Sequence, residues 1–266
     1  MIIRTRNLIA ALAVAASVAG ASAVQAQPAL PSASAQPVRN IVLVHGAFAD
    51  GSGWRGVYDE LTARGYRVNI VQNPLTSLAD DVAATRRVLD RQDGPVILVG
   101  HSYGGTVITE AGADPRVAGL VYVAALAPDA GESTLDQFAE IPPPPDFVIE
   151  EQSDGFGFVN GPKFKAGFAG DTSDADAAFM RDSQVPIAMS AFKAKVTQAA
   201  WRIKPSWFVV ATEDGAIDPK LLRKTARRMG ADTEEVKGSH VVFLTQPKAV
   251  ADVIDRAAKH TAHPAR

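Results

Sequence analysis

Short apolar runs alternate with amphipathic stretches along most of the chain. The apolar runs are rich in Val, Ile and Leu, which is typical of buried parallel strands. They lie at residues 40–45, 95–99, 117–124 and 206–212, and two more polar stretches, 67–71 and 232–237, are also interpreted as strands. Helical spacing of apolar positions occurs at residues 54–64, 78–91, 219–229 and 246–259. This order predicts the α/β class, with a mostly parallel central sheet and helices on both of its faces.

One long segment interrupts this alternation. Residues 128–205 contain a run of four prolines and several glycine–aromatic pairs, and helical spacing returns only at 174–182 and 186–196. Long insertions between regular elements are often functional. We expect a cap here, inserted after the strand that ends near Ala124 and lying over the carboxyl ends of the strands, where open α/β sheets bind ligands.

The N-terminal residues have the pattern of an export signal. Arg4 and Arg6 precede an apolar run at 8–19, and two small-residue cleavage patterns follow. We predict a signal peptide at 1–26, which makes the protein periplasmic or secreted. The alternative is an uncleaved membrane anchor, but the run is shorter than the roughly 20 residues that span a bilayer. After cleavage, no stable membrane anchoring is expected.

The rest of the chain fits one domain. We predict a flexible linker at 27–38, rich in Pro, Ser and Ala, a domain at 39–260, and a polar tail at 261–266. Apolar residues make up 47% of the chain, which argues against disorder.

Charge and cysteine content narrow the function classes. The 27 basic residues, less the two arginines of the signal, stand against 29 acidic ones, so the mature net charge is −4. This argues against nucleic acid as a partner. The absence of cysteine excludes thiolate metal sites, and no metal-binding motif is found, so we expect no metal. The sequence does not indicate an oligomeric state.

A glycine-flanked serine directly follows one predicted strand. The segment GHSYG (residues 100–104) comes after the apolar run at 95–99 and opens a helical stretch. This is the G-x-S-x-G pattern in the strand–turn–helix context that lifts a serine hydroxyl clear of the sheet. The alternative is a glycine-rich turn whose serine only caps the helix. We predict that Ser102 is a nucleophile.

A serine hydroxyl needs a base before it can attack a substrate. His240 lies in a Gly-Ser-His loop after the last predicted strand, at the edge where the strand ends converge. The other histidines are His45 in the first strand's exit turn, His101 beside the serine, and His260 and His263 near the C-terminus. We predict that His240 is the general base, because the order Ser…acid…His fits this kind of site. The alternative is a structural loop histidine.

The acid that orients the imidazole should follow a strand end. Glu213 and Asp214 directly follow the predicted strand at 206–212, and Asp214 is preferred because it is shorter and precedes a glycine. Glu213, Asp218 and Asp129 are the alternatives.

Two backbone N–H groups should bind the oxyanion of the intermediate. We assign them to Tyr103, which follows the nucleophile, and to Ala47 in the turn after the first strand. His45 is expected to pin that turn. The side chains expected to contact substrate are Phe48, His101, Phe192 and Trp201. Basic residues are not gathered near these motifs, so we expect a neutral substrate.

Together these motifs resemble the α/β-hydrolase superfamily. The segments are VLVHGAFADGSGW (42–54), VILVGHSYGG (96–105), ATEDGAIDP (211–219) and GSH (238–240). Within the superfamily the chain is similar to the branch of plant methylesterases, hydroxynitrile lyases and bacterial esterases. The resemblance implies the α/β-hydrolase fold, a Ser102–Asp214–His240 triad, Ala47 and Tyr103 as oxyanion donors, and no cofactor.

The expected function is that of a serine esterase acting on small to medium neutral esters. Those lyases carry an acidic residue where this chain has His101, and a lysine where it has Val241, so the resemblance favours the esterases. Two alternatives stay open, since fold alone does not settle activity. One is a non-catalytic periplasmic small-molecule-binding protein, and the other is lyase or perhydrolase chemistry on the same triad.

Overall fold

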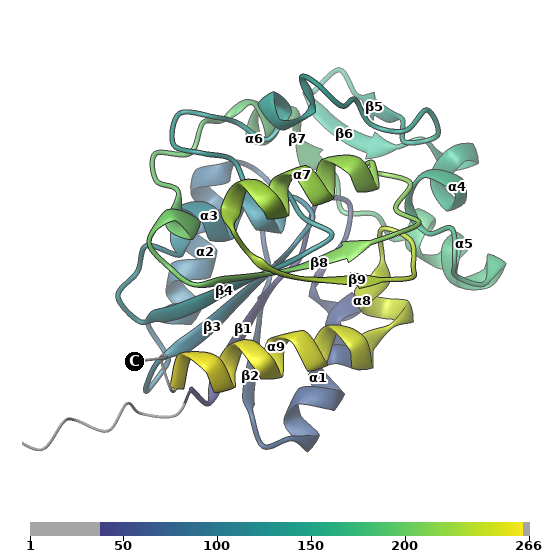
Figure 1. Cartoon of the computed structure of the whole chain (residues 1–266). Helices are drawn as coiled ribbons and strands as arrows, with labels where there is room; N and C mark the ends of the chain where they lie inside the picture. Colours follow the sequence, from purple (N-terminus) through teal and green to yellow (C-terminus); the bar gives the residue numbers. More distant parts are fainter. Residues whose placement is uncertain (1–37, 263–266) are drawn as a thin grey trace, which may run out of the picture. The chain divides into compact units, whose positions relative to one another are not determined.

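Six parallel strands form the central sheet of the computed structural model, which describes residues 38–262 (Figure 1). Their order across the sheet is β2-β1-β3-β4-β8-β9. The strands are β1 (Asn40–Val44), β2 (Arg67–Val71), β3 (Val96–His101), β4 (Val117–Val123), β8 (Ser206–Ala211) and β9 (Asp232–Val236). All five neighbouring pairs run parallel. The predicted fold class is therefore confirmed.

Helices cover both faces of this sheet. They are α1 (Arg55–Ala63), α2 (Leu78–Leu89), α3 (Gly104–Ala111), α7 (Pro219–Met229), α8 (Val242–Thr245) and α9 (Pro247–Ala262). Helices α1 and α9 pack together on one face, and α2, α3 and α7 lie on the other (Figure 1). The four helices predicted outside the insertion correspond to α1, α2, α7 and α9. Helix α9 continues into the residues predicted to be a tail.

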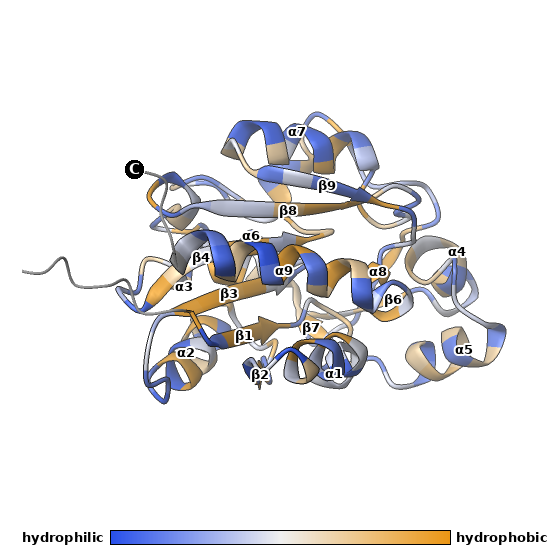
Figure 2. Ribbon diagram, turned by 60° about the horizontal axis from the view of Figure 1, so that its bottom comes forward, coloured by the Kyte–Doolittle hydropathy of each residue, from blue (hydrophilic) through white to orange (hydrophobic). Residues whose placement is uncertain are grey.

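Burial explains the composition of the strands. Every residue of β1 and β3 is buried, because these central strands have helices on both faces, so their sequences are almost uniformly apolar. The edge strand β9 has four exposed polar residues among its five, and Figure 2 shows it as hydrophilic. Charged side chains on an edge strand disfavour pairing with another chain.

The cap, residues 128–205, has structure that the sequence did not predict. It contains an antiparallel sheet, β5-β6-β7, formed by β5 (Ile149–Glu151), β6 (Phe156–Val159) and β7 (Ile187–Ala188). It also contains α4 (Phe164–Phe168), α5 (Asp174–Asp182) and α6 (Met189–Lys193). The predicted helix at 174–182 is confirmed.

The predicted helix at 186–196 is wrong. Ile187 and Ala188 pair with β6, and only the five residues of α6 are helical. The backbone N–H of Ala188 also donates to the carbonyl oxygen of Leu75, outside the cap, at 2.9 Å. These tertiary hydrogen bonds outweigh the local helical spacing.

The predicted signal peptide at 1–26 lies outside the described residues, as do nearly all of the predicted linker and most of the tail. Among residues 38–262, no helix combines the length and the apolar character that a membrane span requires.

Candidate active site

Ser102 lies on a sharp turn between β3 and α3. Its φ is +53°, in the left-handed region that a residue with a side chain occupies only where the surrounding structure holds it there. The turn requires glycine on both sides of the serine. A Cβ at Gly100 would lie 2.5 Å from the carbonyl oxygen of Gly104, and a Cβ at Gly104 would lie 2.7 Å from that of Val44. The G-x-S-x-G segment therefore has the strand–turn–helix geometry that its sequence predicts.

Ser102, His240 and Asp214 form a continuous hydrogen-bonded chain. The Ser102 Oγ lies 2.8 Å from His240 Nε2, and His240 Nδ1 lies 2.8 Å from Asp214 Oδ2. The other carboxylate oxygen, Oδ1, accepts the N–H groups of Ala216 and Ile217, each at 2.8 Å. These bonds fix the carboxylate, so Nδ1 carries the proton it donates to Asp214 and Nε2 can accept the serine proton.

The other acids considered from the sequence do not reach this histidine. Glu213 faces Lys237, with 3.6 Å between Oε1 and Nζ. Asp218 caps α7 by accepting the N–H of Lys220, and Asp129 is paired with Arg202. Only the preferred acid, Asp214, contacts His240.

Neighbouring side chains hold the His240 loop. His101 Nε2 donates to the His240 carbonyl oxygen at 2.9 Å, and the two rings are 4.7 Å apart. Burial lowers the pKa of His101 well below its ordinary value, so this ring is neutral. Asp171 of the cap accepts hydrogen bonds from Ser239 and Thr245, on either side of the histidine. No sequence pattern identifies Asp171, because it lies far from these residues along the chain.

The turn after β1 is pinned by His45, as expected. Its Nδ1 donates to the Gly46 carbonyl oxygen, and its Nε2 accepts the Asn73 N–H, both at 2.9 Å. The Asn73 side chain donates in turn to the His45 carbonyl oxygen at 2.9 Å. Burial lowers the pKa of His45, which favours the neutral ring that the acceptor role requires.

The two expected oxyanion donors border the same cavity as Ser102 and His240. Within residues 38–262, the backbone N–H groups of Ala47 and Tyr103 donate to no other protein group. They are therefore available to an oxygen atom of a ligand in this cavity. The Tyr103 side chain is itself held by a buried carboxylate, Asp81, which accepts its phenolic hydrogen at 2.8 Å.

This cavity has a volume of about 220 Å³ and mostly apolar walls. Phe48 and Phe192 line it, as expected, with ring centroids 6.2 Å apart. The cap supplies further apolar walls, and the loop after β8 supplies Ile217. The cap residues are Leu135, Phe138, Pro143, Phe147 and Ile149.

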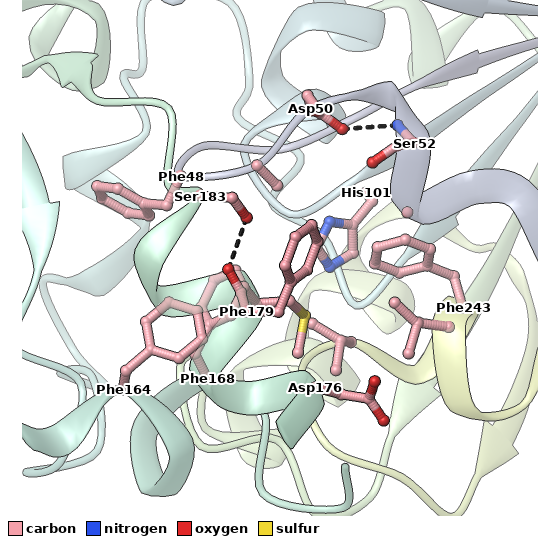
Figure 3. A pocket seen from close by; sticks show the side chains of 15 residues that line it. Phe48, Asp50, Ser52, His101, Phe164, Phe168, Asp176, Phe179, Ser183 and Phe243 are labelled. Atoms are coloured by element: carbon pink, nitrogen blue, oxygen red, sulfur yellow. Dashed lines mark hydrogen bonds between the residues drawn. The ribbon is translucent and has the colours of Figure 1, made fainter. Parts of the chain in front are cut away.

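A second cavity, of about 260 Å³, also has Phe48 in its wall (Figure 3). His101 lines this second cavity together with Phe168 and Phe243, and Ser102 does not. His101 is thus placed apart from the walls of the Ser102 cavity, because its ring is turned against Phe243, 4.4 Å away. Within the described part of the chain, no group of three or more His, Cys, Asp or Glu side chains is placed to hold a metal ion.

The expectation that Trp201 contacts substrate is corrected. Trp201 lines neither cavity. Its Nε1–H donates to the Pro128 carbonyl oxygen at 3.0 Å, and the guanidinium groups of Arg202 and Arg228 lie 4.7 and 5.6 Å from its ring. Trp201 therefore ties the two ends of the cap together.

Comparison with known proteins agrees with this fold. The model of the alpha/beta hydrolase family matches residues 41–253. The chain therefore belongs to the alpha/beta hydrolase family.

Three similar proteins illustrate this membership. Alpha/beta hydrolase nvfD from Aspergillus novofumigatus is 26% identical over 242 residues, which cover 82% of this chain and 96% of that protein. A carbendazim hydrolyzing esterase from a Nocardioides species is 35% identical over 121 residues, covering 40% of this chain and about half (49%) of the esterase. A solved structure of an extracellular alpha/beta-hydrolase from a Paenibacillus species, described as homologous to tobacco salicylic acid binding protein 2, has a TM-score of 0.70. It is 22% identical, and the match covers 83% of this chain and 99% of that one.

Proposed function

We propose that the protein is a carboxylic ester hydrolase that works through an acyl-enzyme on Ser102. The observation that carries this proposal is the hydrogen-bonded chain Ser102–His240–Asp214, with 2.8 Å at each link, beside an apolar cavity. Nucleophile, base and orienting acid are within hydrogen-bonding distance before any substrate binds. The relative named as an esterase supports the reaction class.

In the first half of the reaction, His240 Nε2 takes the hydroxyl proton as Ser102 Oγ attacks the carbonyl carbon of the ester. The resulting oxyanion accepts the N–H groups of Ala47 and Tyr103. Asp214 stabilises the imidazolium that forms and keeps its ring oriented. When the intermediate collapses, His240 returns the proton to the oxygen of the leaving alcohol, and the acyl group stays on Ser102.

In the second half, a water molecule attacks the acyl carbon and gives its proton to His240. The same two N–H groups bind the second oxyanion. Collapse returns the proton to Ser102 Oγ and releases the carboxylic acid, so the enzyme is regenerated without any external oxidant or reductant.

The cavity walls favour small to medium neutral esters. No lysine or arginine lines the Ser102 cavity, and its volume of about 220 Å³ limits the group that it can enclose. Aromatic and aliphatic walls contribute binding by removing apolar substrate surface from water.

Export is part of the proposal. The N-terminal pattern of Arg4, Arg6 and the apolar run at 8–19 supports cleavage after Ala26. N-terminal sequencing of the protein recovered from the periplasm or the medium tests this, and recovery of only the full-length chain in the membrane fraction would contradict it.

Hydrolysis of p-nitrophenyl esters from acetate to palmitate tests the activity. Wild type should release p-nitrophenol, fastest with the shorter acyl chains, and Ser102→Ala should lose at least about 10³-fold in kcat. Ser206→Ala is the matched control, because this serine begins β8, its hydroxyl donates to the Lys204 carbonyl oxygen, and it lines neither cavity. Equal rates for wild type and Ser102→Ala would exclude Ser102 as nucleophile.

Fluorophosphonate labelling separates catalysis from binding. An activated Ser102 should be labelled in wild type, and labelling should be lost in His240→Ala. A folded wild type that hydrolyses no ester and takes no label would be a binding protein instead, and cyanohydrin cleavage without ester hydrolysis would make it a lyase.

A further inference from the structure

Asp81 is a buried carboxylate that the proposed reaction does not use directly. It lies in the first turn of α2 and has no exposed surface. Burying an ionisable carboxyl group costs free energy unless its oxygens are well hydrogen-bonded. The nearest charge that acts on it is that of Asp80, which has the same sign and does not compensate it. We therefore expect Asp81 to have a role that offsets the free-energy cost of burying its carboxyl group.

The two oxygens of Asp81 hold two different parts of the site. Oδ2 accepts the Tyr103 phenolic hydrogen, and Oδ1 accepts the Leu75 backbone N–H, each at 2.8 Å. Leu75 has a φ of +59°, which a branched residue adopts only when its surroundings hold it there. Its carbonyl oxygen accepts the N–H of Ala188 in β7 of the cap. One carboxylate thus links the serine turn to the edge of the cap.

Tyr103 is the residue whose backbone N–H is proposed to bind the oxyanion. Its side chain is fixed at both ends: the ring packs edge-on against Phe192 at 5.5 Å, and the hydroxyl is held by Asp81. An oxyanion donor is effective only when it is aimed before the charge develops. A side chain held this way restricts rotation of the backbone at the turn.

We propose that Asp81 is a positioning residue for the reaction, which holds the Tyr103 side chain so that the adjacent backbone N–H stays aimed at the oxyanion. This inference rests on the proposed ester hydrolysis. Asp81 touches no substrate, because Tyr103 lies between it and the cavity. Through Leu75 it also holds Ala188 at the edge of the cap.

Tyr103→Phe tests the hydrogen bond that links Asp81 to the residue with the oxyanion donor. The variant keeps the ring, its contact with Phe192 and the backbone N–H, and removes only the hydrogen bond to Asp81. We expect kcat for p-nitrophenyl acetate to fall about tenfold, part of the 10²–10³-fold that loss of a whole oxyanion donor costs. KM should change less than about twofold, because the cavity wall is kept.

Tyr122→Phe is the matched control. Tyr122 is also fully buried, and its hydroxyl bonds Thr109 Oγ1 at 2.9 Å, away from the Ser102 cavity. Its loss should lower the free energy of unfolding and leave kcat unchanged. A purely structural role for the Tyr103 hydroxyl would make the two variants behave alike.

Variants of Asp81 test the carboxylate itself. Asp81→Asn can still accept the Leu75 N–H and can donate its amide hydrogen to the Tyr103 hydroxyl, so it should retain more kcat than Asp81→Ala. In the Tyr103→Phe background this difference should shrink, because the link to Tyr103 is already gone and only the bond to Leu75 still distinguishes Asn from Ala. If Asp81→Ala does not fold, the effect of Asp81→Asn on kcat is compared in the wild-type and Tyr103→Phe backgrounds. The effect should be smaller in the Tyr103→Phe background, and equal effects would contradict the positioning role.

The outcomes separate this inference from the proposed function. An active wild type with an unchanged kcat in folded Tyr103→Phe would overturn the positioning role and leave the esterase proposal intact. A wild type without ester hydrolysis or fluorophosphonate labelling would overturn both. A Tyr103→Phe variant that changes only KM would also overturn the positioning role, because the hydroxyl would then act on substrate binding.

Discussion

Replacing Asp81 should change how the stability of the protein depends on pH. Burial raises the pKa of Asp81 from 3.8 to about 6, against the opposing effect of the hydrogen bonds from Leu75 and Tyr103. Between these two pH values the folded protein binds a proton at Asp81 that the unfolded chain has released. The contribution of Asp81 to the free energy of unfolding is therefore fully present below about pH 4 and is lost as the pH rises through about 6.

The size of the effect follows from the two pKa values. The interval from 3.8 to about 6, at about 1.4 kcal/mol for each pKa unit, corresponds to about 3 kcal/mol in the free energy of unfolding. Asn does not titrate, so Asp81→Asn should lack this term. The difference in stability, variant minus wild type, should rise by about 3 kcal/mol from pH 4 to pH 7.

Urea unfolding of both proteins at one-unit steps from pH 4 to pH 8 measures this difference. The titrations that both proteins share cancel in the subtraction. Asp80→Asn is the control on the same helical turn, because hydrogen bonds from Ser77 and Thr76 lower the pKa of that exposed carboxyl. The titration of that carboxyl lies at and below its ordinary pKa of 3.8, so its difference curve should be nearly flat from pH 4 to pH 8. A flat curve for Asp81→Asn, or one that falls with pH, would refute the reasoning.

Three further substitutions, one of them with a matched control, test the site and the cap. Asp214→Asn should keep the fold and lower kcat by about 10⁴-fold, because the imidazole loses the partner that fixes its tautomer; a drop of less than tenfold would remove Asp214 from the triad. Gly46→Ala would place a Cβ 2.7 Å from the Cβ of Ser102 and should lower kcat about 10- to 100-fold. Gly94→Ala is the matched control and should leave kcat unchanged, because the atom nearest to its added Cβ would be 3.5 Å away. Equal kcat values for the two alanine variants would contradict the predicted clash. Trp201→Phe should lower the free energy of unfolding by about 1–2 kcal/mol through the lost hydrogen bond and leave kcat for p-nitrophenyl acetate unchanged; a specific loss of kcat would restore Trp201 to the substrate site.

The sheet and its serine turn were predictable because their signals are local. Buried parallel strands must be apolar on both faces, so β1 and β3 are visible as short Val, Ile and Leu runs. The turn at Ser102 admits no side chain at Gly100 or Gly104, so its glycines are visible too. The chain order of serine, acid and histidine then places His240 at the same sheet edge.

The sequence favoured Asp214 without excluding the other acids, and it did not predict the internal structure of the cap. Glu213 and Asp214 are adjacent, and only the direction of the chain after β8 decides which one reaches His240. The helix expected at 186–196 gave way to pairing with β6, which is remote in sequence. Trp201 was one aromatic residue among many in the cap until its bond to Pro128 fixed its place.

Asp81 illustrates both what the sequence determines and what only the tertiary structure decides. Its position in the first turn of a helix suits the helix dipole, and its spacing from Leu78 and Val82, both buried, already places it on the inward face. Sequence by itself therefore determined the strands of the central sheet, the main helices that cover it and the serine turn, because period and sterics act over a few residues. Only the tertiary structure decided which buried groups meet, because a hydrogen bond such as that between Asp81 and Tyr103 depends on the packing of α2 against α3.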